Sequence, residues 1–136
     1  MAIEPTSEQI QALLSSDIDT EIVMLNLLKF KARSTKEGAA VSGADEYANY
    51  GAAALQMVEA RGGRVVWSGQ PRHVIVGDPG DHDWDMIALV AYPSRDAFIE
   101  MTSTDAYGEI NETRLAAMEN LGLICCEPAP GFEALG

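Results

Sequence analysis

Two long apolar runs constrain this chain more than any other feature of its sequence. Residues 22–28 (Ile-Val-Met-Leu-Asn-Leu-Leu) contain one polar residue, and residues 86–92 (Met-Ile-Ala-Leu-Val-Ala-Tyr) contain only the hydroxyl of a tyrosine. Neither run alternates between apolar and polar residues, and a strand without alternation is covered on both faces. We therefore expect two central strands, each with an apolar layer on either side.

Helical and extended segments are distributed around these runs. A capping box at residues 6–9 predicts a short N-terminal helix, and Gly62 with Gly63 ends a helix that begins near residue 44. The other predicted elements are strands over residues 64–69 and 72–77, a helix from Ser94, a helix over residues 105–120 and a last strand over residues 121–127. Loops are expected over residues 34–43 and 78–83.

This order favours β-α-β-β-α-β, the ferredoxin-like α+β arrangement with an antiparallel sheet. The length of 136 residues fits one domain, residues 1–136, with a helical extension (1–20), a core (21–127) and a tail (128–136). Helices of this fold cover one face of the sheet only. Because the two apolar runs need cover on the other face too, we expect a homodimer in which a second sheet supplies it.

The charge balance excludes several classes of partner. The formal net charge is −12, and the longest basic grouping is too sparse to neutralise nucleic acid: Lys29, Lys31, Arg33 and Lys36. An acidic chain is not drawn to an anionic membrane surface, and no apolar run approaches the ~18 residues of a membrane span. The N-terminus lacks the pattern of a signal peptide, and the adjacent Cys125 and Cys126 suit reduced thiols. We expect a cytoplasmic protein.

Four stretches carry a resemblance to a known family: residues 23–30 (Val-Met-Leu-Asn-Leu-Leu-Lys-Phe), 62–67 (Gly-Gly-Arg-Val-Val-Trp), 84–85 (Trp-Asp) and 92–98 (Tyr-Pro-Ser-Arg-Asp-Ala-Phe). Across residues 21–126 the chain resembles the family called domain of unknown function 1330. That family is similar to the dimeric α/β-barrel superfamily, in which two ferredoxin-like sheets face each other. Its branches include cofactor-free quinone-forming monooxygenases, muconolactone isomerases, haem-degrading oxygenases and stress-response dimers. The resemblance thus implies an architecture and leaves the function open.

Asn26 and His73 are two candidates for a catalytic role. Asn26 is the polar residue of the first apolar run, and burial of an amide without partners costs a few kcal/mol. It either donates a hydrogen bond to a substrate carbonyl or oxyanion, or satisfies neighbouring protein groups. His73 is a candidate general base, whereas His82 is expected to be a solvated loop residue.

Arg114 is the third catalytic candidate. It lies four residues from both Ile110 and Met118, on or beside the apolar stripe of its predicted helix. Its guanidinium either clamps a carboxylate or enolate in a pocket, or it snorkels to solvent, or it pairs with Asp85 or Glu112.

Aromatic residues at strand and helix spacing are candidates for substrate binding, with membership of the core as the alternative: Tyr47, Tyr50, Trp67, Trp84 and Tyr92. No metal site is expected. The alternating aspartates at residues 81–85 resemble a calcium loop, but Met86 and Tyr92 stand where it needs glycine and glutamate. No cofactor is expected either, since no phosphate-binding glycine loop follows a strand.

Two functions remain open at this point. The first is a cofactor-free enzyme of the oxygenase or isomerase kind that acts on a small carbonyl or carboxylate compound in an internal pocket. The second is a non-catalytic dimer that binds a metabolite or has a solidly packed interior. The two differ in whether Asn26 and Arg114 face a cavity or are satisfied by protein groups.

Overall fold

The computed structural model describes residues 3–38 and 40–132. It contains one antiparallel sheet of four strands in the order β2-β3-β1-β4. In chain order the strands are β1 (Ile22–Phe30), β2 (Arg64–Gly69), β3 (Met86–Tyr92) and β4 (Met118–Cys126). The two apolar runs are the adjacent central strands β1 and β3, as their composition predicts.

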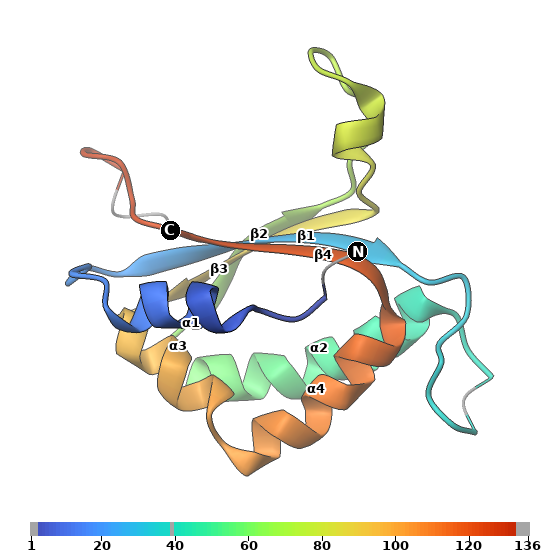
Figure 1. Cartoon of the computed structure of the whole chain (residues 1–136), viewed down its shortest axis with the longest axis horizontal. Coiled ribbons are helices and arrows are strands. Elements are labelled where there is room, and N and C mark those ends of the chain that lie inside the picture. The colour runs from blue at the N-terminus through green and yellow to red at the C-terminus, as the bar shows by residue number, and fades with distance from the viewer. Residues whose placement is uncertain (1–2, 39, 133–136) are drawn as a thin grey trace.

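The helices all lie against one face of the sheet (Figure 1). They are α1 (Ser7–Leu14), α2 (Gly43–Ala60), α3 (Arg95–Thr102) and α4 (Asp105–Ala117). The capping box is confirmed, because the Thr6 side chain accepts from the Gln9 backbone N–H and the Gln9 side chain accepts from the Thr6 N–H. In the described part of the chain no helix is long and apolar enough to cross a membrane.

The ferredoxin-like α+β fold is thus confirmed, and two predicted elements are wrong. Residues 72–77 form no strand, because β2 pairs directly with β3 and leaves them no neighbour to bond with. They belong to an arm, residues 70–85, which also contains the one-turn helix η1 (Pro79–His82). The helix predicted to reach residue 120 ends at Ala117, because Met118 already pairs with Phe30 of β1.

The strand register divides the side chains of the sheet between two faces. Met24, Asn26 and Leu28 of β1 point toward the helices, together with their partners Val90, Ala88 and Met86 on β3. Val23, Leu25 and Leu27 point to the opposite face, which no helix covers (Figure 1). Cys125 lies opposite Met24 and Cys126 opposite Val23, so the two free thiols point to different faces, as predicted.

Candidate functional site

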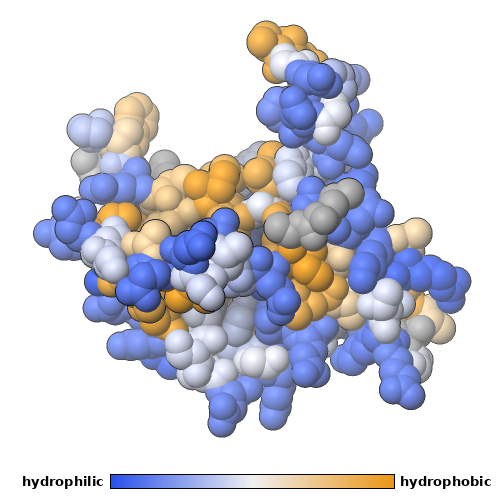
Figure 2. All heavy atoms as spheres, in the orientation of Figure 1, coloured by the Kyte–Doolittle hydropathy of each residue, from blue (hydrophilic) through white to orange (hydrophobic). Residues whose placement is uncertain are grey.

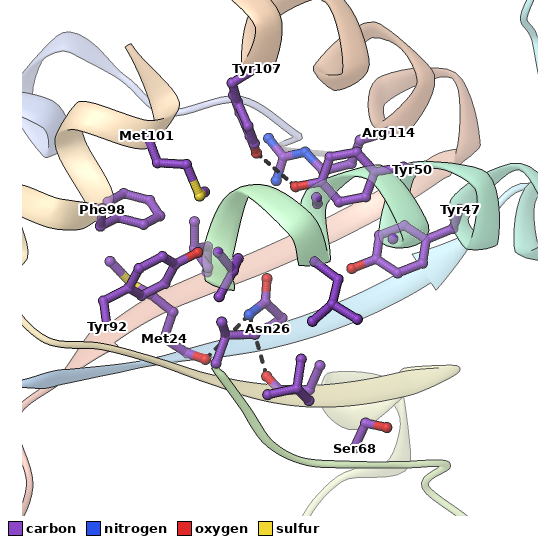
Figure 3. Close-up of a pocket in the computed structure, with 18 of the residues that line it drawn as sticks. Met24, Asn26, Tyr47, Tyr50, Ser68, Tyr92, Phe98, Met101, Tyr107 and Arg114 are labelled. Carbon is purple, nitrogen blue, oxygen red and sulfur yellow. Dashed lines mark hydrogen bonds between the residues drawn. The ribbon is translucent and has the colours of Figure 1, made fainter. Parts of the chain in front are cut away.

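A cavity of about 220 Å³ lies between the covered face of the sheet and helices α2, α3 and α4 (Figure 3). Its walls are mostly apolar, and Leu55, Val65 and Ser68 are exposed at its mouth. The volume equals the liquid share of about seven water molecules. The interior is therefore not packed solid.

Asn26 extends from the middle of β1 into the floor of this cavity. Its Nδ2 donates to the backbone carbonyls of Met24, at 3.2 Å, and Ala88, at 3.3 Å. Both amide hydrogens are thereby used, and Oδ1 points away from the sheet toward the helices (Figure 3). The amide hydrogens thus satisfy neighbouring protein groups, which is the second of the two alternatives considered for Asn26, while its Oδ1 offers an acceptor to the cavity.

Arg114 reaches the cavity from α4, on the wall opposite Asn26. The residue is only 9% exposed, and its Nε donates to Asn111 Oδ1 at 2.8 Å. Its Cζ lies 5.9 Å from the centre of the Tyr50 ring, a cation–π contact. Among the described residues no carboxylate pairs with its guanidinium. Within the described residues the terminal nitrogens of Arg114 form no hydrogen bond to protein, and they keep enough solvent contact to meet a ligand.

The expected ion pair between Arg114 and Asp85 is not formed. Asp85 Oδ2 accepts from the Phe30 N–H at 2.9 Å, and Asp85 Oδ1 lies 3.3 Å from Lys29 Nζ. Lys29 also contacts Asp83 at 3.3 Å, and this hydrogen bond is the main reason that the pKa of Lys29 is raised. These contacts tie the arm to β1, well away from the α4 helix.

Four tyrosines surround the polar end of the cavity: Tyr47, Tyr50, Tyr92 and Tyr107. The hydroxyls of Tyr50 and Tyr107 share a hydrogen bond of 2.8 Å. Burial raises the pKa of Tyr47 to about 12, with Arg114 opposing the shift, and burial also raises the pKa of Tyr50 and Tyr92. At neutral pH these side chains are therefore phenols that can donate hydrogen bonds, and they cannot act as bases.

The structure brings five of the eight predicted site residues to this cavity: Asn26, Tyr47, Tyr50, Tyr92 and Arg114. His73 lies exposed on the arm, and Trp67 lies on the uncovered face of the sheet, 55% exposed. Trp84 lines a smaller hollow of about 120 Å³ beside Lys29 and Asp83. Within the described residues no three His, Cys, Asp or Glu side chains gather as metal ligands.

Sequence analysis missed Tyr107 and Phe98 as cavity residues. Tyr107 is the third residue of α4, which the Thr104 cap separates from α3, and only the packing of α4 against α2 places it beside Tyr50. Phe98 packs edge-on against Tyr92, with ring centres 5.2 Å apart. Their helical spacing was visible in the sequence, but that pattern also describes ordinary core residues.

Comparison with known proteins supports the fold and leaves the site without an assigned activity. Residues 38–127 match the profile of the family described as "Domain of unknown function (DUF1330)". The RPA0582 protein of unknown function from Rhodopseudomonas palustris is 36% identical, with a TM-score of 0.86 over 93% of this chain and 96% of that one. No curated protein matches the chain.

More distant structures share the architecture alone. The At3g17210 protein from Arabidopsis thaliana is 16% identical, with a TM-score of 0.59 over 79% of this chain and 95% of that one. A dabb family protein with a ferredoxin-like fold from Mesorhizobium loti is 12% identical, with a TM-score of 0.53 over 81% and 98%. The expected kinship with ferredoxin-like dimeric α/β-barrel proteins is thereby confirmed at the level of fold.

Proposed function

We propose that this chain, which belongs to the family described as "Domain of unknown function (DUF1330)", binds a small organic anion that also carries a hydroxyl or N–H group. One observation supports this most strongly. A cation without a counter-ion, Arg114, faces an acceptor without a donor, Asn26, across an otherwise apolar cavity. Small carbonyl and carboxylate compounds have the matching groups.

The physical basis of the proposal is the free-energy cost of the empty site. A buried guanidinium is stable only when its charge is compensated and its N–H groups are bonded. The Tyr50 ring and Asn111 compensate Arg114 in part. A carboxylate or enolate would supply a bidentate partner of opposite charge, which forms hydrogen bonds roughly twice as strong as neutral ones.

The residues that line the cavity also restrict the class of reaction that it can support. Among the described residues that line the cavity none is a carboxylate or an imidazole, so the lining offers no ordinary general base. The reaction that this site suits best is therefore one on a substrate that is already ionised. Arg114 would hold the negative charge of a carboxylate or enolate, and the tyrosine hydroxyls would donate hydrogen bonds to it. Cofactor-free oxygenase- or isomerase-like chemistry, one of the two functions that the sequence leaves open, includes such reactions.

Calorimetric titration with three matched compounds tests the binding proposal. Mandelate carries a carboxylate and a hydroxyl, phenylacetate lacks the hydroxyl, and mandelamide lacks the charge. We expect mandelate to bind best. Arg114→Met should remove the advantage of mandelate over mandelamide, and Asn26→Leu should remove its advantage over phenylacetate, each by about tenfold. Equal affinity of the wild type and Arg114→Met for mandelate would overturn the proposal.

A homodimer is the second part of the proposal. On the uncovered face the charged Lys29 lies near one end of β1. Other positions of β1, β3 and β4 on this face carry no charge: Val23, Leu25, Leu27, Ile87, Leu89, Ala91, Gly122, Ile124 and Cys126. A second copy of this face would bury it through a two-fold axis, as an isologous interface does. Sedimentation of the wild type over a range of concentrations tests it, with a monomer at every concentration as the contrary result.

A further inference from the structure

The arm carries an apolar tip that nothing in its own chain covers. It leaves the sheet between β2 and β3 and rises on the side opposite the helices (Figure 1). Ile75 is 87% exposed and Val76 89% exposed. Monomeric proteins expose single apolar side chains routinely, but two adjacent branched ones at the end of a projection indicate a contact surface.

The base of the arm is held in place. The Asp85 N–H donates to the Leu28 carbonyl at 2.7 Å, and Lys29 Nζ lies 3.3 Å from both Asp83 and Asp85. The Asp78 side chain caps η1 by accepting from the Gly80 N–H at 2.9 Å. The arm is therefore anchored to β1 in a position that keeps its tip away from its own sheet.

The backbone of the tip is also without partners. In the described part of the chain, residues 72–77 neither donate nor accept a backbone hydrogen bond. Their sequence, Arg-His-Val-Ile-Val-Gly, has the β-branched residues typical of a strand. The segment thus has the composition of a strand and lacks a neighbour within the chain.

The uncovered sheet face is narrow. Its four strands lie about 4.8 Å apart, and about seven residues rise about 3.3 Å each, which gives a flat footprint of about 440 Å². Side-chain relief makes the accessible surface of the face larger than this footprint, and a specific interface usually buries about 800 Å² of accessible surface on each partner. A second contact region on the same side of the molecule would enlarge the interface, and the arm stands there (Figures 1 and 2).

We infer that the arm of each copy clasps a second copy of this chain, with Val74, Ile75 and Val76 packed against the partner. The inference rests on the homodimer proposed above and adds an element to its interface. The occupant is a second copy because one chain carries both the largely apolar face and the apolar tip on the same side. A two-fold axis that joins the two faces also carries each arm beyond the edge of its own sheet toward the other copy.

The test compares two double variants of the full chain by sedimentation velocity. Ile75→Ser with Val76→Ser removes the apolar tip, and both residues are so exposed that the fold should not change. Ile10→Ser with Leu14→Ser is the matched control, because these residues are 46% and 48% exposed on α1, away from the open face. We expect the arm variant to raise the dimer dissociation constant about tenfold or more, and the control to leave it unchanged.

Hydrogen exchange of the amides of residues 72–77 gives a second readout. These amides should exchange more slowly in the wild-type dimer than in Ile124→Asp, a variant with a charge on the open face of the edge strand β4. A dimer that Ile124→Asp disrupts but the arm variant does not, with equal exchange in both states, would overturn the inference and leave the homodimer intact. A wild type that is monomeric throughout would overturn both, whereas the mandelate titration reports on the cavity independently.

Discussion

The two faces of the sheet have the opposite polarity to that expected of a monomeric protein without a ligand. The covered face holds the polar groups, with Asn26 and Arg114 around a cavity. The uncovered face holds apolar side chains, with Ile124 48% exposed and Trp67 55% exposed. A chain with a net charge of −12 has ample polar residues for an exterior, yet this face is mostly apolar, with the charged Lys29 and Arg64 near the ends of β1 and β2.

The covered face thus lacks partners for polar groups, and the uncovered face lacks cover for apolar groups. Buried polar groups without partners and exposed apolar groups without cover both cost free energy. A small anion would complete the inner face, and a second copy would complete the outer one. Since the strands β1 and β3 supply both faces from alternating residues, binding in the cavity and pairing of copies share one rigid element.

The largest expected effect is on the uncovered face. Ile124→Asp places a carboxylate on the apolar surface of the edge strand β4 in each copy, so a two-fold dimer would gain two charges in its interface. We expect the dimer dissociation constant to rise by roughly a hundredfold or more. Ile10→Asp, at a similar exposure on α1, should leave it unchanged. Sedimentation velocity measures both, and equal effects of the two variants would show that the open face is not special.

High pH should lower the free energy of unfolding through the buried tyrosines of the covered face. The folded-state pKa of Tyr47 is about 12 because of burial, against about 10 when unfolded. A phenol with a raised pKa contributes its full stability below pH 10 and loses it as the pH rises toward 12, because the unfolded chain releases its proton first. The loss is about 2 kcal/mol for Tyr47 alone.

Urea unfolding at a series of pH values, followed by circular dichroism, measures this loss. Tyr47→Phe is the control, because it removes one of the buried phenols. Its free energy of unfolding should fall less steeply with pH in this window than that of the wild type. Identical slopes would mean that Tyr47 ionises freely and that the cavity is open to solvent there.

The sequence predicted that the central strands are covered on both faces, but it did not show which face each residue of β2 lies on. The unbroken apolar character of residues 22–28 and 86–92 predicted cover on both sides, and both segments are central strands. Trp67 was a candidate for the pocket because it is an aromatic residue at strand spacing. A bulge between Val65 and Trp67 shifts the register, so Val65 faces the cavity and Trp67 the uncovered side. The composition of the strand gives no sign of this extra residue.

Other errors have a similar origin in long-range contacts. The β-branched residues of segment 72–77 predicted a strand, but strand formation needs a neighbour that the chain does not offer. Asn26 was correctly placed at the cavity, yet its hydrogen-bonding role depends on Ala88, which lies 62 positions along the chain. Local patterns predicted which residues share a face, whereas the direction of a hydrogen bond required the tertiary structure.

The stability of an Arg114 variant distinguishes a ligand-binding role of this residue from a structural one. Arg114→Met keeps an apolar stem of similar length and removes the buried charge, so the ligand-free protein should gain about 1 kcal/mol of unfolding free energy. Thermal and urea unfolding measure this gain. A loss of about 2 kcal/mol or more would instead show that the Asn111 and Tyr50 contacts satisfy the guanidinium. In that case the covered face would be complete without an anion.

The smallest expected effect concerns the hydroxyl pair behind Arg114. Tyr107→Phe removes one partner of the 2.8 Å hydrogen bond and leaves the buried Tyr50 hydroxyl without it. We expect a loss of about 1 kcal/mol in unfolding free energy at neutral pH, together with weaker mandelate binding, because the Tyr50 ring under Arg114 is less firmly held. Tyr47→Phe is the matched control for the unfolding free energy, since no hydrogen bond of the Tyr47 hydroxyl is formed within the described residues. Urea unfolding compares the two variants, and equal losses of unfolding free energy would show that the hydroxyl pair does not position Tyr50.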